Sequence, residues 1–366
     1  MKGPEMSKGG LQHLLSRVEA FTARLGIRFP ILLAPMAGAC PSSLSIAVAN
    51  AGGMGACGAL LMTPESITSW VDEFRQKSER PFQINLWIPD PPPARDLEAE
   101  ARQRDFLSSW GPSVTVEMGD AVLPNFEQQC RAMIAARPKV ISSIMGLYPP
   151  AFVDGMKTHG ILWFATATTV AEARAAETAG ADAIIAQGME AGGHRGAFHA
   201  EDAEVQAVGL MALVPQICDA VTVPVIATGG IADGRGIAAA LTLGASAVQI
   251  GTGFLRSPEA KIPPAYAERL GRTESHGTRL TRAFSGRPGR SVRTRFVEAA
   301  ASPDAPPFAP YPVQRGLTRL MREDAARTGD AERMQMWAGQ AACLAQTDPA
   351  GVITQKLWEQ ALQLLA

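Results

Sequence analysis

The stretch ADAIIAQGMEAGGHRGA, residues 181–197, joins a short apolar run to a loop with almost no side-chain bulk. The run ADAIIAQG predicts a buried strand, and the loop after it carries the paired glycines Gly192 and Gly193 directly before His194. Glycines leave the backbone accessible, so a flat ligand can lie against this loop while one imidazole projects towards the ligand. The stretch therefore predicts a strand that ends in a binding site.

Seven further apolar runs repeat this design, each closed by a turn-forming or polar residue and most of them followed by a stretch rich in Ala, Glu and Arg. The eight candidate strands are residues 30–38, 53–61, 81–87, 139–146, 161–168, 181–188, 223–230 and 246–252. Apolar strands that alternate with helices indicate a parallel sheet covered on both faces. Eight such units favour an α/β fold of the (β/α)8 TIM-barrel type over a doubly wound open sheet, which shares the alternation.

Helix signals lie between the strands. Residues 169–179 have Thr169 as an N-cap and Gly180 at the C-terminal end, and residues 234–243 are closed by Gly244. Residues 12–25 carry apolar side chains at helical spacing and predict a short leading helix. These signals support the alternation of strands and helices.

Two segments do not fit the repeat and suggest a domain division. We expect residues 1–256 to form the barrel, with an excursion at about 88–124 that is too long for a simple connection. Beyond residue 256 the alternation stops. We expect residues 257–345 to form a smaller, mainly helical, lid-like substrate domain, and a final helix within residues 346–366 to return to the barrel.

The composition favours a small-molecule ligand. Lys and Arg number 34 against 35 Asp and Glu, a formal net charge of −1, so no global field favours nucleic acid or an anionic membrane. Residues 1–10 are polar, and no apolar run approaches the roughly 20 residues of a membrane span, so we expect a cytoplasmic protein. The five cysteines are widely spaced and odd in number, which predicts buried, reduced thiols and no metal site.

Two glycine clusters predict a phosphate site. Gly229 and Gly230 follow the seventh strand, and Gly251 and Thr252 follow the eighth. Phosphate binds at these two loops in barrels of this kind, where backbone N–H groups without side chains can point at the anion. The alternative is that the glycines only make tight turns. Walker A and GxGxxG sequences are absent, so a cofactor with a phosphate tail fits better than ATP or a Rossmann-bound dinucleotide.

Other strand ends offer contacts for a flat heteroaromatic ring. Ala34, Pro35, Met36 and Ala37 close the first strand with small and soft side chains on which a ring can rest. Asn85 and Gln187 end the third and sixth strands, and their amides suit the edge of an isoalloxazine pyrimidine ring. Amides at strand ends also serve as ordinary caps.

His194 is the predicted catalytic residue, because it lies in a glycine loop at the rim where barrels carry their active sites. The other histidines are expected to be structural. Glu190 is expected to orient His194 or to bind a backbone amide, and Arg195 to lie at the surface or to contact a lid. The rim carries no pair of carboxylates and no Ser/His/Asp set, so hydrolysis lacks its usual groups.

The motifs APMAG, QIN, AQGMEAGGHRG, VIATGGIADGRG and VQIGTGF, in this order and spacing, resemble those of the nitronate monooxygenase family. The resemblance runs from about residue 29 to 254 and resumes at TRAFSGRPGR, PYPVQ and MWAGQAA, which resemble the class I pattern of the family. It implies an FMN-dependent (β/α)8 barrel that oxidises alkyl nitronates with O₂ to carbonyl compounds and nitrite, without a metal.

The resemblance also assigns residues. His194 matches the active-site histidine and Tyr311 a tyrosine of the substrate pocket. The residues that match flavin contacts are Asn85, Gln187, Gly192, Gly230, Gln249, Ile250, Gly251 and Thr252. The family pattern often has a further tyrosine and a lysine near Tyr311, where this chain has Arg315.

Two other functions are weighed against this one. An FMN-dependent reductase resembling the enoyl-acyl-carrier-protein reductases shares the EAGGH and AGGIADGRG patterns, but tends to carry GGMAW where this chain has APMAG. A non-catalytic flavin-binding barrel would need the glycines and not His194. The basic run at residues 282–296 is expected to be an exposed face, or to contact a substrate carboxylate or a neighbouring chain in a homo-oligomer.

Overall fold

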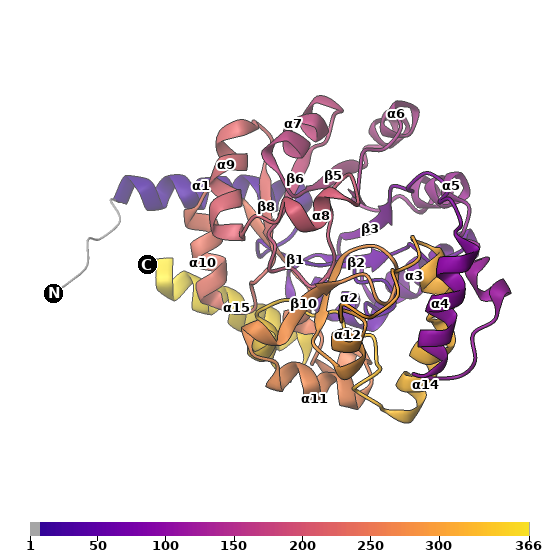
Figure 1. Cartoon of the computed structure of the whole chain (residues 1–366). Helices are drawn as coiled ribbons and strands as arrows, with labels where there is room; N and C mark the ends of the chain where they lie inside the picture. Colours follow the sequence, from indigo (N-terminus) through magenta and orange to yellow (C-terminus); the bar gives the residue numbers. More distant parts are fainter. Residues whose placement is uncertain (1–7, 366) are drawn as a thin grey trace.

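A computed structural model describes residues 8–365 of the chain (Figure 1). Most of the polar stretch at residues 1–10, and the last residue of the segment 346–366, lie outside the described residues. The described strands form one eight-stranded sheet and one three-stranded sheet.

The eight-stranded sheet is parallel throughout, in the order β1-β9-β8-β6-β5-β4-β3-β2. Its strands are β1 (Ile31–Leu33), β2 (Gly55–Gly58), β3 (Phe82–Trp87), β4 (Val140–Ile144), β5 (Leu162–Ala167), β6 (Ala183–Gln187), β8 (Val225–Thr228) and β9 (Ala247–Ile250). Each lies within one of the eight predicted runs.

The sheet closes on itself between β1 and β2. Leu32 bridges Met54 in parallel, and the N–H of Leu33 donates to the carbonyl of Met54 at 2.9 Å. This contact joins the two ends of the strand order and confirms the predicted (β/α)8 barrel.

Helices surround the barrel, and short 3₁₀ turns join them (Figure 1). The helices are α1 (Lys8–Leu25), α2 (Ser42–Ala51), α3 (Pro64–Lys77), α4 (Leu97–Ser108), α5 (Phe126–Ala136), α6 (Pro150–Thr158), α7 (Val170–Thr178), α8 (Asp202–Val205), α9 (Leu210–Ala220), α10 (Gly234–Thr242), α11 (Pro264–Arg272), α12 (Arg295–Ala299), α13 (Val313–Leu317), α14 (Arg319–Thr328) and α15 (Ala350–Leu365). The 3₁₀ turns are η1 (Val116–Gly119), η2 (Thr252–Phe254), η3 (Pro258–Ala260), η4 (Ser275–Gly277) and η5 (Ala342–Leu344).

The capping residues predicted from the sequence lie at the ends of helices α7 and α10. The Thr169 side chain accepts a hydrogen bond from the N–H of Glu172 at the start of α7. Gly180 and Gly244, which follow α7 and α10, have φ values of +96° and +112°. These are left-handed conformations that favour glycine, so both helices end where the sequence predicts.

Helix α1 closes the end of the barrel opposite the carboxyl ends of the strands. Its buried Phe21 and Leu25 share one cluster with the inward-facing side chains of the strands, among them Phe164 and Ile185. The Phe21 and Phe164 rings lie 6.1 Å apart. The leading helix therefore fills one mouth and leaves the other for a ligand.

The excursion after β3 packs on the segment that follows the barrel. Figure 1 shows α4 beside α14, and Leu107 of α4 lies in one buried cluster with Phe296, Leu317 and Met321. Helix α15 returns to pack against α10 and α2.

A three-stranded antiparallel sheet ties the histidine loop to the C-terminal segment. Strand β7 (Gly193–His194) pairs with β11 (Gly289–Val292), and β11 pairs with β10 (Thr278–Thr281). His194 and its pairing partner Gly289 lie 95 residues apart in sequence, so this pairing holds the histidine loop against the C-terminal segment.

Two expectations about single residues need correction. The run at residues 282–296 is not an exposed basic face, because Arg287 and Arg290 are 1% and 4% exposed. All five cysteines are free, but only Cys40, Cys57 and Cys130 are buried, whereas Cys218 is half-buried and Cys343 is exposed. Local sequence does not show which distant segments meet a side chain: Arg287 binds Asp90 and the Ala197 carbonyl, and Arg290 binds the Met189 carbonyl.

Candidate active site

A cavity of about 520 Å³ opens at the carboxyl ends of the barrel strands, where the strand-end loops meet the C-terminal segment. The residues assigned to the cofactor from sequence that line it are Ala34, Pro35, Met36, Ala37, Asn85, Gln187, Gly192, Gly193, Gly229, Gly230, Gln249, Gly251 and Thr252. His194 lines it as well. One cavity therefore brings together residues from five strand ends.

Two of the sequence assignments lie outside the lining. Ile250 is 1% exposed and packs in the core between strands and helices. Tyr311 lies behind the lining residue Trp87, with the two ring centroids 5.3 Å apart.

The glycine loops present bare backbone to the cavity. Gly229 and Gly230 have φ values of +119° and +67°, which favour glycine. Within residues 8–365, the N–H groups of these two glycines and of Gly251 and Thr252 form no hydrogen bond. A Cβ on Gly251 would approach the Met36 sulfur to 3.2 Å, so a side chain there would crowd this wall. Four free N–H groups over two adjacent loops suit a phosphate group.

His194 is half-buried and fixed on one side. Its Nε2 lies 2.7 Å from the Ser285 hydroxyl, which also lies 3.1 Å from the carbonyl oxygen of Arg287. The imidazole packs between two indoles, with centroids 4.5 Å from Trp87 and 4.7 Å from Trp337. Since Ser285 occupies Nε2, the Nδ1 atom is the ring nitrogen without a partner in the described chain.

Electrostatics keep the imidazole neutral. Burial, followed by the positive charges of Arg315 and Arg287, lowers the pKa of His194 to about 3. A neutral imidazole at pH 7 can donate or accept one hydrogen bond, and it contributes no full positive charge.

The loop that carries His194 is held by Gln187 and Arg195. The Gln187 amide oxygen accepts from the N–H of Gly196 at 2.7 Å and from Arg195 at 3.1 Å, and its nitrogen donates to the His194 carbonyl at 3.1 Å. The Gln187 amide thus forms its hydrogen bonds with the loop that carries His194.

Arg195 is not at the surface, as we had expected, but 1% exposed. Its guanidinium donates to the carbonyl of Gly188 at 2.7 Å, and burial lowers its pKa to about 10. Glu190 does not touch His194; its carboxylate accepts from the N–H of Leu210 at 2.9 Å, the second of the two roles expected.

Sequence reasoning missed three residues around the histidine, and it noted a fourth, Arg315, without placing it at the cavity. Trp87 and Trp337 line the cavity on either side of the ring, Ser285 binds Nε2, and the side chain of Arg315 reaches the cavity wall. The motif TRAFSGRPGR contained Ser285, but no spacing rule places a residue 91 positions away against an imidazole.

The cations of the cavity wall differ in their partners. Arg322 donates to the Arg315 carbonyl at 2.9 Å and to the Thr318 hydroxyl at 3.1 Å. The Arg315 guanidinium forms no hydrogen bond or ion pair within residues 8–365, and burial lowers its pKa. Beside it, the buried Tyr311 hydroxyl also lacks a partner, and burial raises its pKa to about 12. Arg315 lines the cavity and is free to bind an anion, whereas Tyr311 lies behind the lining residue Trp87.

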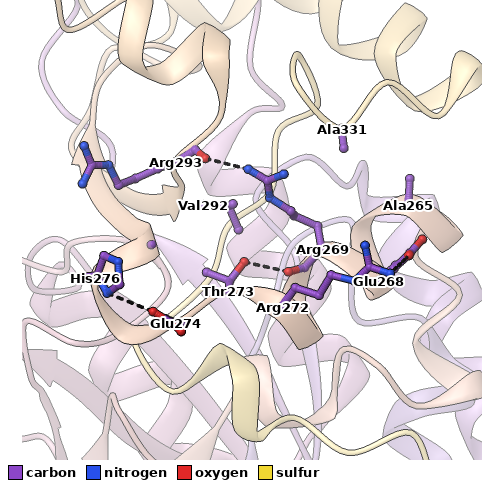
Figure 2. Close-up of a pocket in the computed structure, with 11 residues that line it drawn as sticks. Ala265, Glu268, Arg269, Arg272, Thr273, Glu274, His276, Val292, Arg293 and Ala331 are labelled. Atoms are coloured by element: carbon purple, nitrogen blue, oxygen red, sulfur yellow. Dashed lines mark hydrogen bonds and ion pairs between the residues drawn. The ribbon is translucent and has the colours of Figure 1, made fainter.

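A second hollow, of about 400 Å³, lies on the C-terminal segment against α11 (Figure 2). Its charged side chains pair with one another: Arg272 with Glu268 at 2.6 Å, and His276 with Glu274 at 3.5 Å. It contains none of the residues assigned from the sequence to the cofactor or to catalysis, so we place the candidate site in the larger cavity.

Within residues 8–365, a metal-ligand cluster and a membrane-spanning helix are both absent. No three His, Cys, Asp or Glu side chains in that range are grouped so as to hold a metal ion. No helix there has both the length and the apolar character that crossing a membrane requires.

Comparison with known proteins agrees with the geometry. The family model for nitronate monooxygenase matches residues 19–360. A nitronate monooxygenase from Pseudomonas aeruginosa is 37% identical over 347 residues, which cover 93% of this chain and 99% of that protein.

Solved structures show the same fold. Nitroalkane oxidase from Streptomyces ansochromogenes has a TM-score of 0.84 and 35% identity, covering 95% of this chain and 100% of that one. FabK from Thermotoga maritima has a TM-score of 0.74 and 30% identity, covering 94% and 96%. From a family match along nearly the whole length and a site built at the expected strand ends, it follows that this chain belongs to the nitronate monooxygenase family, and is a flavin-dependent oxidoreductase.

Proposed function

We propose that this enzyme binds FMN and oxidises alkyl nitronates with O₂, giving a carbonyl compound and nitrite. The observation that carries the proposal is the single cavity in which two free glycine loops, an amide-lined floor and a neutral His194 meet. Overall, two nitronates and one O₂ give two carbonyl compounds and two nitrite ions. In each nitronate the C=N bond breaks, one oxygen atom of O₂ becomes the carbonyl oxygen, and the nitrogen leaves as nitrite.

The residues present fit FMN. The free N–H groups of Gly229, Gly230, Gly251 and Thr252 would hold the phosphate. Ala34 to Ala37 would support one face of the ring, and Asn85 lines the cavity where a ring edge would lie. Once bound, FMN supplies the electron-accepting ring, and the protein has to bind, orient and shield the substrate.

The substrate side consists of His194 and Arg315, which line the cavity, with Tyr311 behind Trp87. His194 is neutral at pH 7, and Tyr311 stays protonated because burial raises its pKa to about 12. The Arg315 guanidinium supplies the positive charge. A nitronate is a planar anion with two oxygens on one atom, the shape that an arginine can bind through two parallel N–H groups.

Trp87 and Trp337 would exclude water from the reacting atoms, since their indoles flank the imidazole on either side. A dry site strengthens the attraction between the anion and Arg315.

The test is an oxygen-electrode assay of the purified flavoprotein with propyl-2-nitronate, together with identification of the flavin released on denaturation. O₂ uptake with release of nitrite, and a flavin that is FMN, would support the proposal. No uptake in a protein that holds FMN would reject it.

One observation favours a second candidate, a reductase that uses NAD(P)H. The likeness to FabK is substantial, with a TM-score of 0.74 at 30% identity. An anaerobic mixture of the enzyme with NADH or NADPH separates the two functions. Rapid bleaching of the flavin without turnover of a nitronate would favour the reductase, and slow bleaching would favour the monooxygenase.

A further inference from the structure

Below the cavity, four polar side chains form a relay through the interior of the barrel. The Asn85 Nδ2 atom lies 3.1 Å from the Ser142 hydroxyl, which lies 3.0 Å from the Gln83 Oε1 atom. The Gln83 Nε2 atom lies 3.0 Å from the Gln249 Oε1 atom. The two middle members, Gln83 and Ser142, are fully buried, and the two outer members, Asn85 and Gln249, are each 6% exposed and line the cavity.

One backbone carbonyl sets the direction of every bond in this relay. The Leu33 oxygen lies 3.0 Å from the Gln83 amide and can only accept, so Gln83 turns its NH₂ group towards β1 and β9. Its Oε1 atom then faces Ser142 and must receive the serine hydrogen. With that hydrogen used, Ser142 can only accept from Asn85, which therefore turns its NH₂ group inwards.

The relay decides which atoms reach the cavity. Asn85 is left with Oδ1, an acceptor, and Gln249 is left with Nε2, a donor, and neither atom has a partner in the described part of the chain. A ligand that lies across this floor must therefore offer an N–H group to Asn85 and an oxygen or nitrogen acceptor to Gln249. A ring imide, with one N–H between two carbonyl groups, carries both.

We propose that Gln83 and Ser142 are positioning residues that fix the hydrogen-bond polarity of the cavity floor for the imide edge of the flavin. The inference rests on the proposed FMN function and deepens it. Neither residue lines the cavity, and both act through Asn85 and Gln249. Because Asn85 presents an acceptor, it stabilises the protonated imide and raises the pKa of the flavin N3–H group; an inverted amide would stabilise the imide anion and lower that pKa.

The test is a pH titration of the visible spectrum of the bound flavin in wild type and Ser142→Ala. Without the serine oxygen, Asn85 loses the partner that orients it, and the N3–H pKa is expected to fall by roughly one unit, the size of one hydrogen bond. The affinity for FMN, measured by fluorescence on reconstitution of apoprotein, is expected to fall roughly tenfold.

Ser143→Ala is the matched control. Ser143 is equally buried on the same strand, but its hydroxyl accepts from the Trp163 indole at 3.0 Å on the outer side of the barrel. This variant loses a buried hydroxyl without touching the relay, so its flavin titration is expected to match wild type. Equal shifts in both serine variants would show a general loss of packing and would overturn the proposal.

Gln83→Met breaks the relay one step earlier and keeps the volume of the side chain. It is expected to lower the N3–H pKa in the same direction, and it provides the test if Ser142→Ala does not fold. An unchanged N3–H pKa in a folded relay variant overturns the relay while leaving the FMN function intact. A wild-type protein that binds no flavin overturns both.

Discussion

At the scale of single residues, the protonation state of His194 decides its chemistry. Burial, followed by the charges of Arg315 and Arg287, lowers its pKa to about 3, whereas a free imidazole titrates near ~6.5. The ring is then neutral throughout pH 5–8, so kcat/KM for a pre-formed nitronate is expected to show no acidic limb near pH 6.5. His194→Ala is expected to lower kcat/KM by roughly 100-fold. An acidic limb near pH 6.5 that disappears in His194→Ala would contradict this.

The same shift predicts how stability changes with pH. As the pH falls from about 6.5 towards 3, the unfolded chain gains a proton at this position and the native chain does not. The free energy of unfolding of wild type should therefore fall relative to that of His194→Gln through this window, by about 2 kcal/mol at pH 5, and stay level above about pH 7.5. Urea denaturation at pH 5 and pH 7.5 measures the difference.

Arg315 is the residue where this chain departs from the lysine of the family pattern. Its guanidinium reaches the cavity without a partner in the described residues, so Arg315→Met is expected to raise KM for a nitronate by roughly 10- to 100-fold. Arg315→Lys should recover part of the loss, since it restores the charge but not the paired N–H groups. Arg319→Met is the control, because Arg319 is 54% exposed and bound to Glu323. Equal effects at both positions would indicate a long-range effect of charge.

At the scale of elements, the pairing of β7 with β11 holds the histidine in place. Gly289 lies opposite His194, and a Cβ there would meet the Trp337 ring at 2.9 Å. Gly289→Ala should push the indole off the imidazole and lower kcat by roughly tenfold, because small displacements of reacting groups are costly. Gly9→Ala, with open space around its Cβ, should leave kcat unchanged. Trp fluorescence alongside kinetics tests this; a tenfold loss without a spectral change would contradict the mechanism.

The elements also show how far sequence reasoning extends. The eight strands and the ends of α7 and α10 follow from local patterns: apolar runs, Thr169 as a cap, and glycines at left-handed positions. The positions of the glycine loops also follow from local patterns, because each loop comes directly after an apolar run. Pairing of β7 with β11 depends on how distant segments meet, and no local signal contains it. The burial of Arg195 and the contact of Ser285 with His194 follow from that pairing, so they could be found only in the folded structure.

At the scale of the whole molecule, the excursion after β3 and the C-terminal segment meet over the open end of the barrel. They share a buried cluster that includes Leu107 and Phe296, and Gln103 donates to the carbonyl of Pro306 at 2.9 Å. Helix α1 covers the opposite end, where Phe21 contacts the strands. The residues that line the cavity come from the strand-end loops and the C-terminal segment, and the excursion packs against the C-terminal segment. The excursion therefore supports the cavity indirectly, through the segment that lines it.

The ion pair between Asp90 and Arg287 is the charged link between the excursion and the C-terminal segment. Arg287 is 1% exposed and also donates to the Ala197 carbonyl at 2.8 Å, next to the histidine loop. Asp90→Asn leaves this charge buried without its carboxylate. The free energy of unfolding is expected to fall by roughly 1–3 kcal/mol, less than for a fully buried pair because the Asp90 side chain is 31% exposed.

Because the guanidinium lies beside the loop of His194, kcat/KM should fall together with stability in Asp90→Asn. Glu127→Gln removes one partner of an exposed pair, with side chains 76% and 80% exposed, and is expected to change neither quantity measurably. Thermal unfolding measures the stability of both variants, and nitronate turnover measures their kcat/KM. Wild-type stability in Asp90→Asn would mean that the buried cluster and the hydrogen bond from Gln103 are enough to join the two segments, and that the Asp90–Arg287 pair does not contribute.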